Sequence, residues 1–376
     1  GDNAMLSTTS GGNNIGIGTT LTGNIDGSNN VAVGDDSLTR ANSSWNTVVG
    51  RNAYQLGTGG SNTIIGGDAM SEGSGQNNVA VGTNALWYGN GDGNVAIGAN
   101  SNYKNQTLTN FTNSTAVGFS SYASGTNSVA IGSSATSSDT DAIAIGNGTT
   151  ASGESSIAIG SYNSSLGNTT ADGNGAISIG DGAVSKEHSV ALGTNATANS
   201  AGGIAIGKSA EASPKSGYSS FSDGVAIGTN AKVEGTSCGW GPCSYTAGIA
   251  IGHDAYTMSS DGIVIGNSAS AECNSVSIGY NTTTERHSVA IGHEAKAIDK
   301  SVAIGYEACK DVTGSNVVCI GSGSGPTYDM DKSKDHMVYL GTSSDTVYIP
   351  GNLIVGKDTL LGARAVNDGH TYAVYL

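Results

Sequence analysis

A five-residue core recurs along most of the chain, and this repeat constrains the fold more than any other feature of the sequence. It occurs as Ser-Val-Ala-Ile-Gly at 128–132, 288–292 and 301–305, with close variants elsewhere. Twenty cores end in a glycine, and these are Gly18, Gly34, Gly50, Gly66, Gly82, Gly98, Gly118, Gly132, Gly146, Gly160, Gly180, Gly193, Gly207, Gly228, Gly252, Gly266, Gly279, Gly292, Gly305 and Gly321. The first six are 16 residues apart, and most later ones are 13 or 14 apart. A period this short predicts a solenoid of stacked coils.

The residues before each glycine form two apolar sides. In an extended strand Val129 and Ile131 lie on one face, and the small Ala130 lies on the other. Such a short coil encloses only one thin row of side chains, so the second apolar side needs another surface. We expect that surface to be another copy of the chain. Three copies would bury it around a closed axis, whereas a dimer would leave part of it wet, so the sequence predicts a homotrimer.

The repeat glycines, exemplified by Gly132, Gly146, Gly160, Gly292 and Gly305, are expected to turn the chain at positive φ. Three residues after the glycine, Ala occurs in twelve of the twenty coils, which suits a crowded corner. Stacked at about 4.8 Å, the spacing of neighbouring strands, these coils would form a rod about 95 Å long.

The composition excludes several classes of partner. The net charge is −15 and only 12% of the residues are charged, so a phosphate backbone is not expected to bind. No run approaches the roughly 18 apolar residues needed to cross a bilayer. We therefore expect no nucleic acid partner and no membrane insertion in this segment.

The core and its flanks are similar to a known family. Asn-Ser-Val-Ala-Ile-Gly-Ser-Ser-Ala at 127–135 resembles the repeat of YadA-like heads in trimeric autotransporter adhesins, and the resemblance extends over about residues 13–321. It implies an all-β fold, a left-handed parallel β-roll of about twenty short coils in an intertwined homotrimer. It also implies binding to host surfaces.

The C-terminal part departs from that family. Residues 322–376 show neither a heptad pattern nor a neck motif, and Met-Val-Tyr-Leu-Gly (337–341) and Thr-Val-Tyr-Ile-Pro-Gly (346–351) resemble segments of bacteriophage and large DNA virus fibres. We therefore expect an N-terminal lead-in (1–12), a β-roll head (13–321) and a small β-rich tail or connector (322–376). These features favour a viral fibre over a bacterial adhesin.

Four excursions, at about 99–114, 161–174, 208–222 and 229–246, are predicted to leave the wall of the solenoid. Insertions of this kind commonly gather on the binding face of repeat proteins. The candidate receptor-binding residues are their aromatic side chains, Tyr103, Phe111, Tyr162, Tyr218, Phe221, Trp240 and Tyr245. Exposed rings among Asn, Ser and Asp suit carbohydrate. The alternative is that they cover the crevice between protomers.

Cysteine and histidine give weaker indications. Cys238 and Cys243 flank Gly-Trp-Gly-Pro, a turn-like segment that could close a small disulfide loop or leave two free thiols. His253 and His293 each follow a repeat glycine, so a trimer could gather three such rings around an ion. Surface or packing histidine is the simpler interpretation, and no metal or cofactor is expected.

Two groups of carboxylates stand out, Asp139 with Asp141, and Asp329 with Asp331 and Asp335. Neither matches a calcium β-roll motif, and catalytic pairs cannot be assigned from spacing alone. We interpret them as solvated turn residues.

The sequence thus predicts a non-enzymatic trimeric fibre or spike that projects from a virion and attaches to a host cell surface through glycans. One alternative is the head of a bacterial trimeric autotransporter adhesin that binds host matrix or cells. Another is a tailspike-like polysaccharide depolymerase, which thin coils disfavour. Ice binding would need an exposed Thr ladder in place of the Val-Ala-Ile face.

Overall fold

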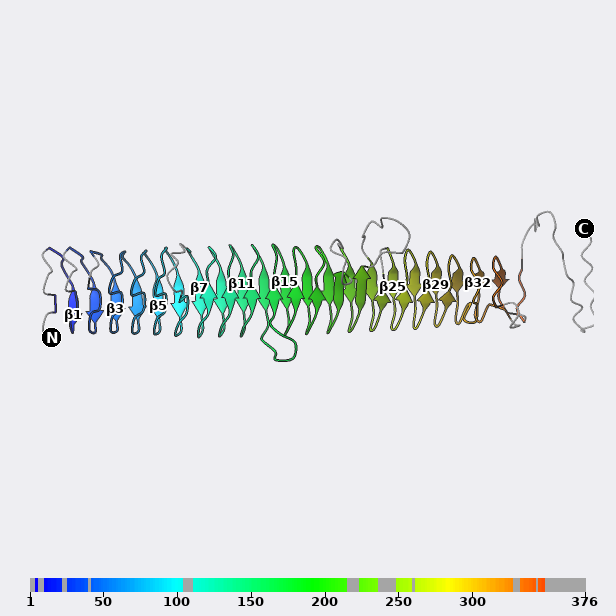
Figure 1. The fold of residues 1–376 in the computed structure, drawn as a ribbon, viewed down its shortest axis with the longest axis horizontal. Helices are drawn as coiled ribbons and strands as arrows, with labels where there is room; N and C mark the ends of the chain where they lie inside the picture. The colour runs from blue at the N-terminus through cyan, green and yellow to red at the C-terminus, as the bar shows by residue number, and fades with distance from the viewer. Residues whose placement is uncertain are drawn as a thin grey trace, which may run out of the picture.

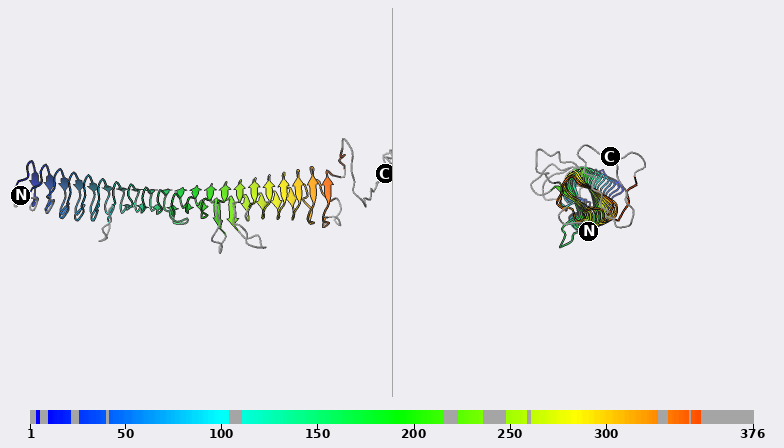
Figure 2. Two further views of the ribbon diagram at one scale, coloured as in Figure 1. Left: turned by 90° about the horizontal axis from the view of Figure 1, so that it is seen from above. Right: turned by 90° about the vertical axis from the view of Figure 1, so that its right-hand side faces the viewer.

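A computed structural model describes residues 4–5, 10–21, 26–39, 42–103, 111–214, 223–235, 248–258, 261–326, 332–342 and 344–348. These residues form an all-β parallel β-solenoid, a long narrow rod whose strands lie side by side from one end to the other (Figure 1). Seen along its axis the rod has a narrow outline, because successive coils superimpose (Figure 2). The described residues contain no helix, and so none that could cross a membrane.

The first sheet has 21 strands, one from each coil. All have three residues, and they are β1 (Ile15–Ile17), β2 (Val31–Val33), β3 (Thr47–Val49), β4 (Thr63–Ile65), β5 (Val79–Val81), β6 (Val95–Ile97), β7 (Thr115–Val117), β9 (Val129–Ile131), β11 (Ile143–Ile145), β13 (Ile157–Ile159), β15 (Ile177–Ile179), β17 (Val190–Leu192), β19 (Ile204–Ile206), β21 (Val225–Ile227), β23 (Ile249–Ile251), β25 (Ile263–Ile265), β27 (Val276–Ile278), β29 (Val289–Ile291), β31 (Val302–Ile304), β32 (Val318–Ile320) and β33 (Val338–Leu340). Each pairs in parallel with the equivalent strand of the next coil, so that Ala130 lies beside Ala144. The repeat cores therefore form the strands that the sequence predicts.

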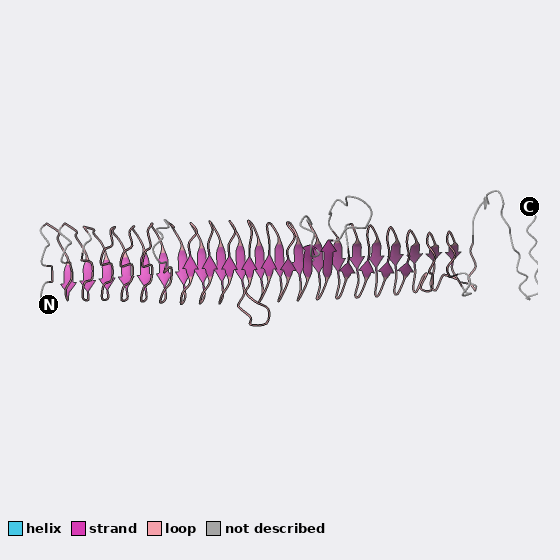
Figure 3. Ribbon diagram, viewed as in Figure 1, coloured by secondary structure: helices cyan, strands magenta, loops and turns pink. Residues whose placement is uncertain are grey.

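A second sheet begins after β7 and accompanies the first through the middle of the rod (Figure 3). Its 12 short parallel strands are β8 (Tyr122–Ala123), β10 (Thr136–Ser137), β12 (Thr150–Ala151), β14 (Thr170–Ala171), β16 (Val184–Ser185), β18 (Thr197–Ala198), β20 (Glu211–Pro214), β22 (Lys232–Gly235), β24 (Tyr256–Thr257), β26 (Ser270–Ala271), β28 (Thr283–Thr284) and β30 (Lys296–Ala297). The sequence analysis did not predict this sheet, because ten of its strands have only two residues and carry no periodic signal.

In the coils of 13 or 14 residues, here called narrow coils, small side chains fill the space between the two sheets. Ala144 of β11 and Ala151 of β12 belong to one buried cluster, and both are inaccessible to solvent. The corner alanines, such as Ala135 and Ala196, are buried as well. Two sheets this close leave room for little beyond a methyl group, which explains the abundance of Ala in the repeat.

The coils of 16 residues and the 20-residue coil that runs from Gly98 to Gly118 are here called wide coils, and larger side chains fill them. Leu38, Tyr54, Met70 and Leu86 occupy equivalent positions in successive coils and are all buried in one cluster. Each adopts positive φ, at a corner four residues beyond the repeat glycine. The extra residues of the wide repeat therefore build a thicker core.

A ladder of buried asparagines runs along the same wide coils, one residue before each strand. Its members are Asn30, Asn46, Asn62, Asn78 and Asn94, all without solvent access. The side-chain oxygen of Asn62 accepts a hydrogen bond from the backbone N–H of Asn78 at 2.9 Å, and the Asn62 amide donates to the carbonyl of Gly75 at 3.0 Å. Each side-chain amide thus links its own coil to the next one and satisfies backbone groups that would otherwise lack partners.

The repeat glycines stack on one another along the rod. Gly132, Gly146, Gly292 and Gly305 have φ between 124° and 140°. The positive φ expected at Gly160 is wrong, since Gly160 lies outside this region of backbone conformation. A side chain is excluded there by contact alone, because a Cβ atom would lie 2.4 Å from Thr169 Oγ1 and 2.7 Å from the carbonyl oxygen of Gly180.

The first sheet continues past residue 321, where the sequence analysis ended the β-roll head. Strand β33 pairs with β32 in the same register, with Val338 beside Val318 and Leu340 beside Ile320. The segment Met-Val-Tyr-Leu-Gly at 337–341, which we set apart as tail, therefore forms a further coil of the rod.

Candidate functional site

The outer face of the first sheet is an apolar strip along the rod. On the single chain Ile131 is 39% exposed, whereas Ala130 between the strand ends is inaccessible. The expectation that the strands have two apolar sides is confirmed, with Ala inside and Val or Ile outside. The exposed members are Ile15, Ile17, Val49, Ile65, Ile97, Ile131, Ile145, Ile179, Ile263, Ile265, Ile291, Ile304, Ile320, Val338 and Leu340. Contiguous apolar surface on this scale marks an interaction site.

The outer face of the second sheet is different in character. Its partly exposed side chains are mostly polar, including Thr136, Thr150, Thr170, Glu211 and Lys232. Lys232 lies 2.6 Å from Glu234 and 3.1 Å from Glu211, and the hydrogen bond to Glu234 raises the pKa of its ammonium group. The outer faces of the two sheets therefore differ, and of these two faces only that of the first sheet is apolar. We call that surface the assembly face.

The predicted receptor-binding aromatics that the structure describes are Tyr103, Phe111 and Tyr162, and these three are not gathered in one place. Tyr103 is 37% exposed and Tyr162 is 54% exposed, the latter on an excursion that projects from the rod between β13 and β14 (Figure 1). Tyr218, Phe221, Trp240 and Tyr245 lie outside the described residues.

The exposure that we expected for Phe111 is wrong. Phe111 is 2% exposed and belongs to the buried cluster that contains Leu86 and Met70. Its backbone carbonyl accepts a hydrogen bond from the Asn94 side chain at 3.0 Å. A wide coil has room for this ring in its interior, so Phe111 contributes to the core and offers no surface to a receptor.

The cysteines divide between described and undescribed parts of the chain. Cys238 and Cys243, which we considered as a pair, lie outside the described residues. Cys309, in the turn after β31, forms a disulfide with Cys319 of β32, with 5.6 Å between their Cα atoms. Both are buried. The sequence analysis missed this bond, although Cys319 occupies the inward Ala position of its strand and Cys309 the inward corner position.

The two repeat histidines have local partners. His293 lies between two tyrosine rings of neighbouring coils, 4.9 Å from Tyr280 and 5.1 Å from Tyr306 between ring centroids, and both pairs are stacked. Nδ1 of His253 lies 2.8 Å from a carboxylate oxygen of Asp254. Within the described ranges no three His, Cys, Asp or Glu side chains come together as metal ligands.

The candidate carboxylates hold turns. Asp139 accepts a hydrogen bond from the backbone N–H of Thr140 at 2.7 Å, and Asp141 accepts one from the Asn127 amide at 3.0 Å. The backbone N–H of Ser315 donates to Asp335 at 2.7 Å, and this bond lowers the pKa of that carboxyl group. Asp329 and Asp331 lie outside the described residues.

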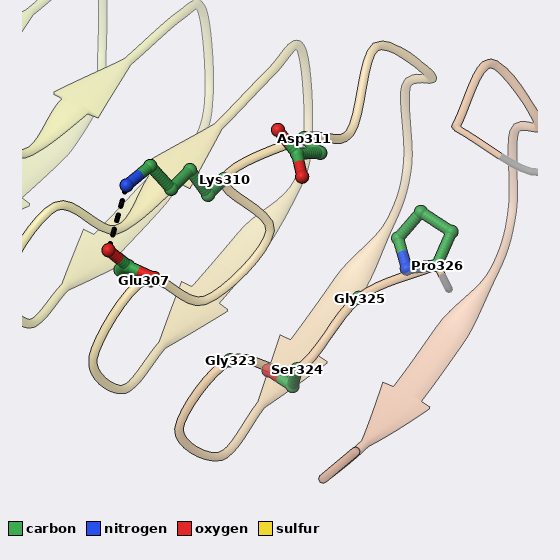
Figure 4. A pocket seen from close by; sticks show the side chains of 7 residues that line it. All are labelled: Glu307, Lys310, Asp311, Gly323, Ser324, Gly325 and Pro326. Carbon is green, nitrogen blue, oxygen red and sulfur yellow. Dashed lines mark hydrogen bonds and ion pairs between the residues drawn. The ribbon is translucent and has the colours of Figure 1, made fainter. Parts of the chain in front are cut away.

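A small hollow of about 110 Å³ lies near the C-terminal end of the described rod. Figure 4 shows its lining, which is Glu307, Lys310, Asp311, Gly323, Ser324, Gly325 and Pro326. Lys310 lies 2.7 Å from both Glu307 and Glu294, and these hydrogen bonds raise the pKa of its ammonium group. A lysine held charged by two carboxylates is a poor base, so this arrangement indicates a surface ion network rather than catalytic chemistry.

Three aromatic side chains that the sequence analysis left apart come together on neighbouring wide coils. Trp87 and Tyr88 are stacked with 5.7 Å between ring centroids, and Tyr103 lies 5.3 Å from Trp87 at 54°. Loss of hydration raises the pKa of the Tyr88 hydroxyl, and the nearby charge of Glu72 raises it further. The 16-residue period could have revealed this cluster, because it aligns Trp87 with Tyr103 and Tyr88 with Glu72.

Comparison with known families agrees with this geometry. The family model of the YadA head domain repeat matches residues 112–135, 138–163, 185–210 and 284–308. These four segments are similar to YadA head repeats. All four matches lie beyond residue 111, so the Asn ladder, which ends at Asn94, lies outside the YadA head segments that are matched. No curated protein matches the chain. The resemblance of the tail to viral fibres has no support from these comparisons.

Proposed function

We propose that this chain is part of a non-enzymatic, trimeric, adhesin-like fibre that projects from a cell surface and attaches it to host cells or matrix. The assembly face carries this proposal, because its exposed Val and Ile side chains run the length of the rod while the opposite side is polar. Burying apolar surface contributes about 25 cal/mol per Å², so a strip of this length favours association strongly.

Three copies suit the assembly face better than two. A strip on one side of a narrow rod can be turned toward a common axis, where each copy covers part of the face of both neighbours. The matched YadA head repeats point in the same direction, since heads of that kind are surface-exposed, extracellular domains of trimeric adhesins.

The family match favours a bacterial surface over a virion. The viral alternative depends on the tail, and β33 makes part of that tail an ordinary coil of the rod. A polysaccharide depolymerase is less well supported, because the described candidate carboxylates hold turns and the hollow near Lys310 is small.

Two measurements test the proposal. Light scattering at native salt should give three times the 37.2 kDa of one chain, and the purified rod should bind host cells or matrix and compete with the intact fibre. A stable monomer at micromolar concentration would contradict the proposal, because the assembly face would then remain exposed to water.

A further inference from the structure

The aromatic cluster on the wide coils lies on the side of the rod that the assembly face leaves open. Asn102, the residue before Tyr103, donates its backbone N–H to Ser121 at 2.8 Å and accepts the backbone N–H of Ala123 at 2.6 Å. Ala123 belongs to β8, the first strand of the second sheet. The cluster therefore continues the line of the polar second sheet, opposite the outward Val and Ile side chains.

The coil does not need aromatic side chains at these positions. In the preceding wide coils the places equivalent to Trp87 and Tyr103 are taken by Thr39, Gln55 and Ser71. The backbone bonds that join the coils are the same with or without a ring, as in the bond from Glu72 N–H to the Trp87 carbonyl. The rings thus occupy a place that smaller polar residues fill elsewhere, where Thr39 and Ser71 are buried and Gln55 is partly exposed.

Their arrangement combines an apolar surface with acceptors at its edge. Trp87 is partly exposed between the stacked ring of Tyr88 and the tilted ring of Tyr103, and Glu72 is exposed beside Tyr88. Aromatic rings contact the C–H face of a sugar, while carboxylate and phenol oxygens accept or donate hydrogen bonds to its hydroxyl groups.

We infer that Trp87, Tyr88, Tyr103 and Glu72 form a binding site for a neutral saccharide. This inference rests on the proposed attachment function and names the ligand class of one surface that would carry it. A macromolecular partner normally covers about 800 Å² on each side, far more than three rings provide, so a short oligosaccharide fits better. Glu72 and the chain's net charge of −15 oppose sialylated or sulfated ligands.

A trimer would present this site three times around one level of the rod. A single exposed sugar site binds weakly, and simultaneous engagement of several sites on one surface raises the apparent affinity without new contacts. The site and the assembly face would therefore work together, since association of the chains multiplies the number of sites.

The test uses the full chain on an array of neutral, sialylated and sulfated glycans, followed by titration with lactose and N-acetyllactosamine. Trp87→Gln and Tyr103→Gln introduce the residue that Gln55 already supplies at the equivalent place, so the coil should fold normally. We expect neutral glycans to bind and each substitution to weaken binding at least tenfold. Trp45→Gln is the matched control, because Trp45 is 67% exposed and outside the cluster, and it should bind as the unsubstituted chain does.

Several results would overturn the inference. They are binding confined to charged glycans, unchanged binding by Trp87→Gln and Tyr103→Gln, or no neutral glycan bound by a chain that still assembles and adheres to host cells. The last result would leave the proposed function standing. A monomer that binds neutral glycans through Trp87 would support the site and contradict the fibre instead.

Discussion

At the scale of single residues, the repeat glycine is fixed by two independent constraints. Gly132 has φ of 132°, a backbone conformation that L-residues rarely adopt. A Cβ atom there would also lie 2.5 Å from the carbonyl oxygen of Gly146 in the next coil. Gly160 shows that the second constraint can act alone. The glycine is therefore required by the stacking of coils and not only by the turn.

We predict that Gly132→Ala destabilises the rod by about 2–4 kcal/mol, because the new methyl group must displace the neighbouring backbone and strain φ. The measurement is the thermal midpoint at fixed protein concentration. Gly12→Ala is the control, since no atom lies within 4 Å of its Cβ position and its φ is not strained. Equal midpoints for the two variants would contradict the constraint assigned to Gly132.

At the scale of structural elements, two kinds of coil share one sheet. The interior of a narrow coil is filled by Ala side chains from both sheets. The interior of a wide coil is filled by large apolar side chains and the Asn ladder. Asn62 contacts three partners, which are the Asn78 N–H, the Gly75 carbonyl and the Tyr54 hydroxyl. A buried amide with all its groups paired fixes the register between its own coil and the next one.

Asn62→Leu should therefore destabilise the rod by about 2–4 kcal/mol, because it keeps the branched shape of the side chain but removes the partners of the buried Asn78 N–H and the part-buried Gly75 carbonyl. Amide hydrogen exchange should show the loss as faster exchange at Asn78 and in the adjacent wide coils. Gln76→Leu, at an exposed position on the next coil, should change stability by less than about 0.5 kcal/mol. If the Asn78 amide still exchanged slowly in Asn62→Leu, the stabilising role assigned to the Asn ladder would be contradicted.

At the scale of the whole molecule, the unlike outer faces of the two sheets decide how chains associate. Ile131 and Ile145 lie side by side on the first sheet, and Thr136 and Thr150 lie side by side on the second. The four residues come from the same two coils, so the two sides can be compared directly.

The double variant Ile131→Lys and Ile145→Lys should weaken association, because burying two unpaired charges at the assembly face is costly. Light scattering across a dilution series should show dissociation at a concentration at least tenfold higher than for the unsubstituted chain. Thr136→Lys with Thr150→Lys adds the same charge on the opposite side and should leave the mass unchanged. If both pairs behaved alike, the assembly face would be wrongly placed.

The sequence alone determined the repeat, its strands and its glycines. Alternation in a three-residue strand places Val129 and Ile131 opposite Ala130, and the glycine after them must stack closely, so an all-β solenoid follows from local chemistry. The same 16-residue period aligns Trp87 with Tyr103. Stacking successive coils in that register would have predicted that the two rings are neighbours.

Only the tertiary structure decided which side of each strand faces the interior. Both sides are apolar, so the alternation of residues along the strand does not distinguish them. The width of a coil determines which side faces inward. The space between two close sheets holds Ala130 but is too small for Ile131, whereas a wide coil holds even Phe111. The second sheet, the Cys309–Cys319 bond and the continuation into β33 depend on contacts between coils rather than on any segment's own preference. Volume and register between neighbouring coils are properties of the stack, and no single repeat contains them.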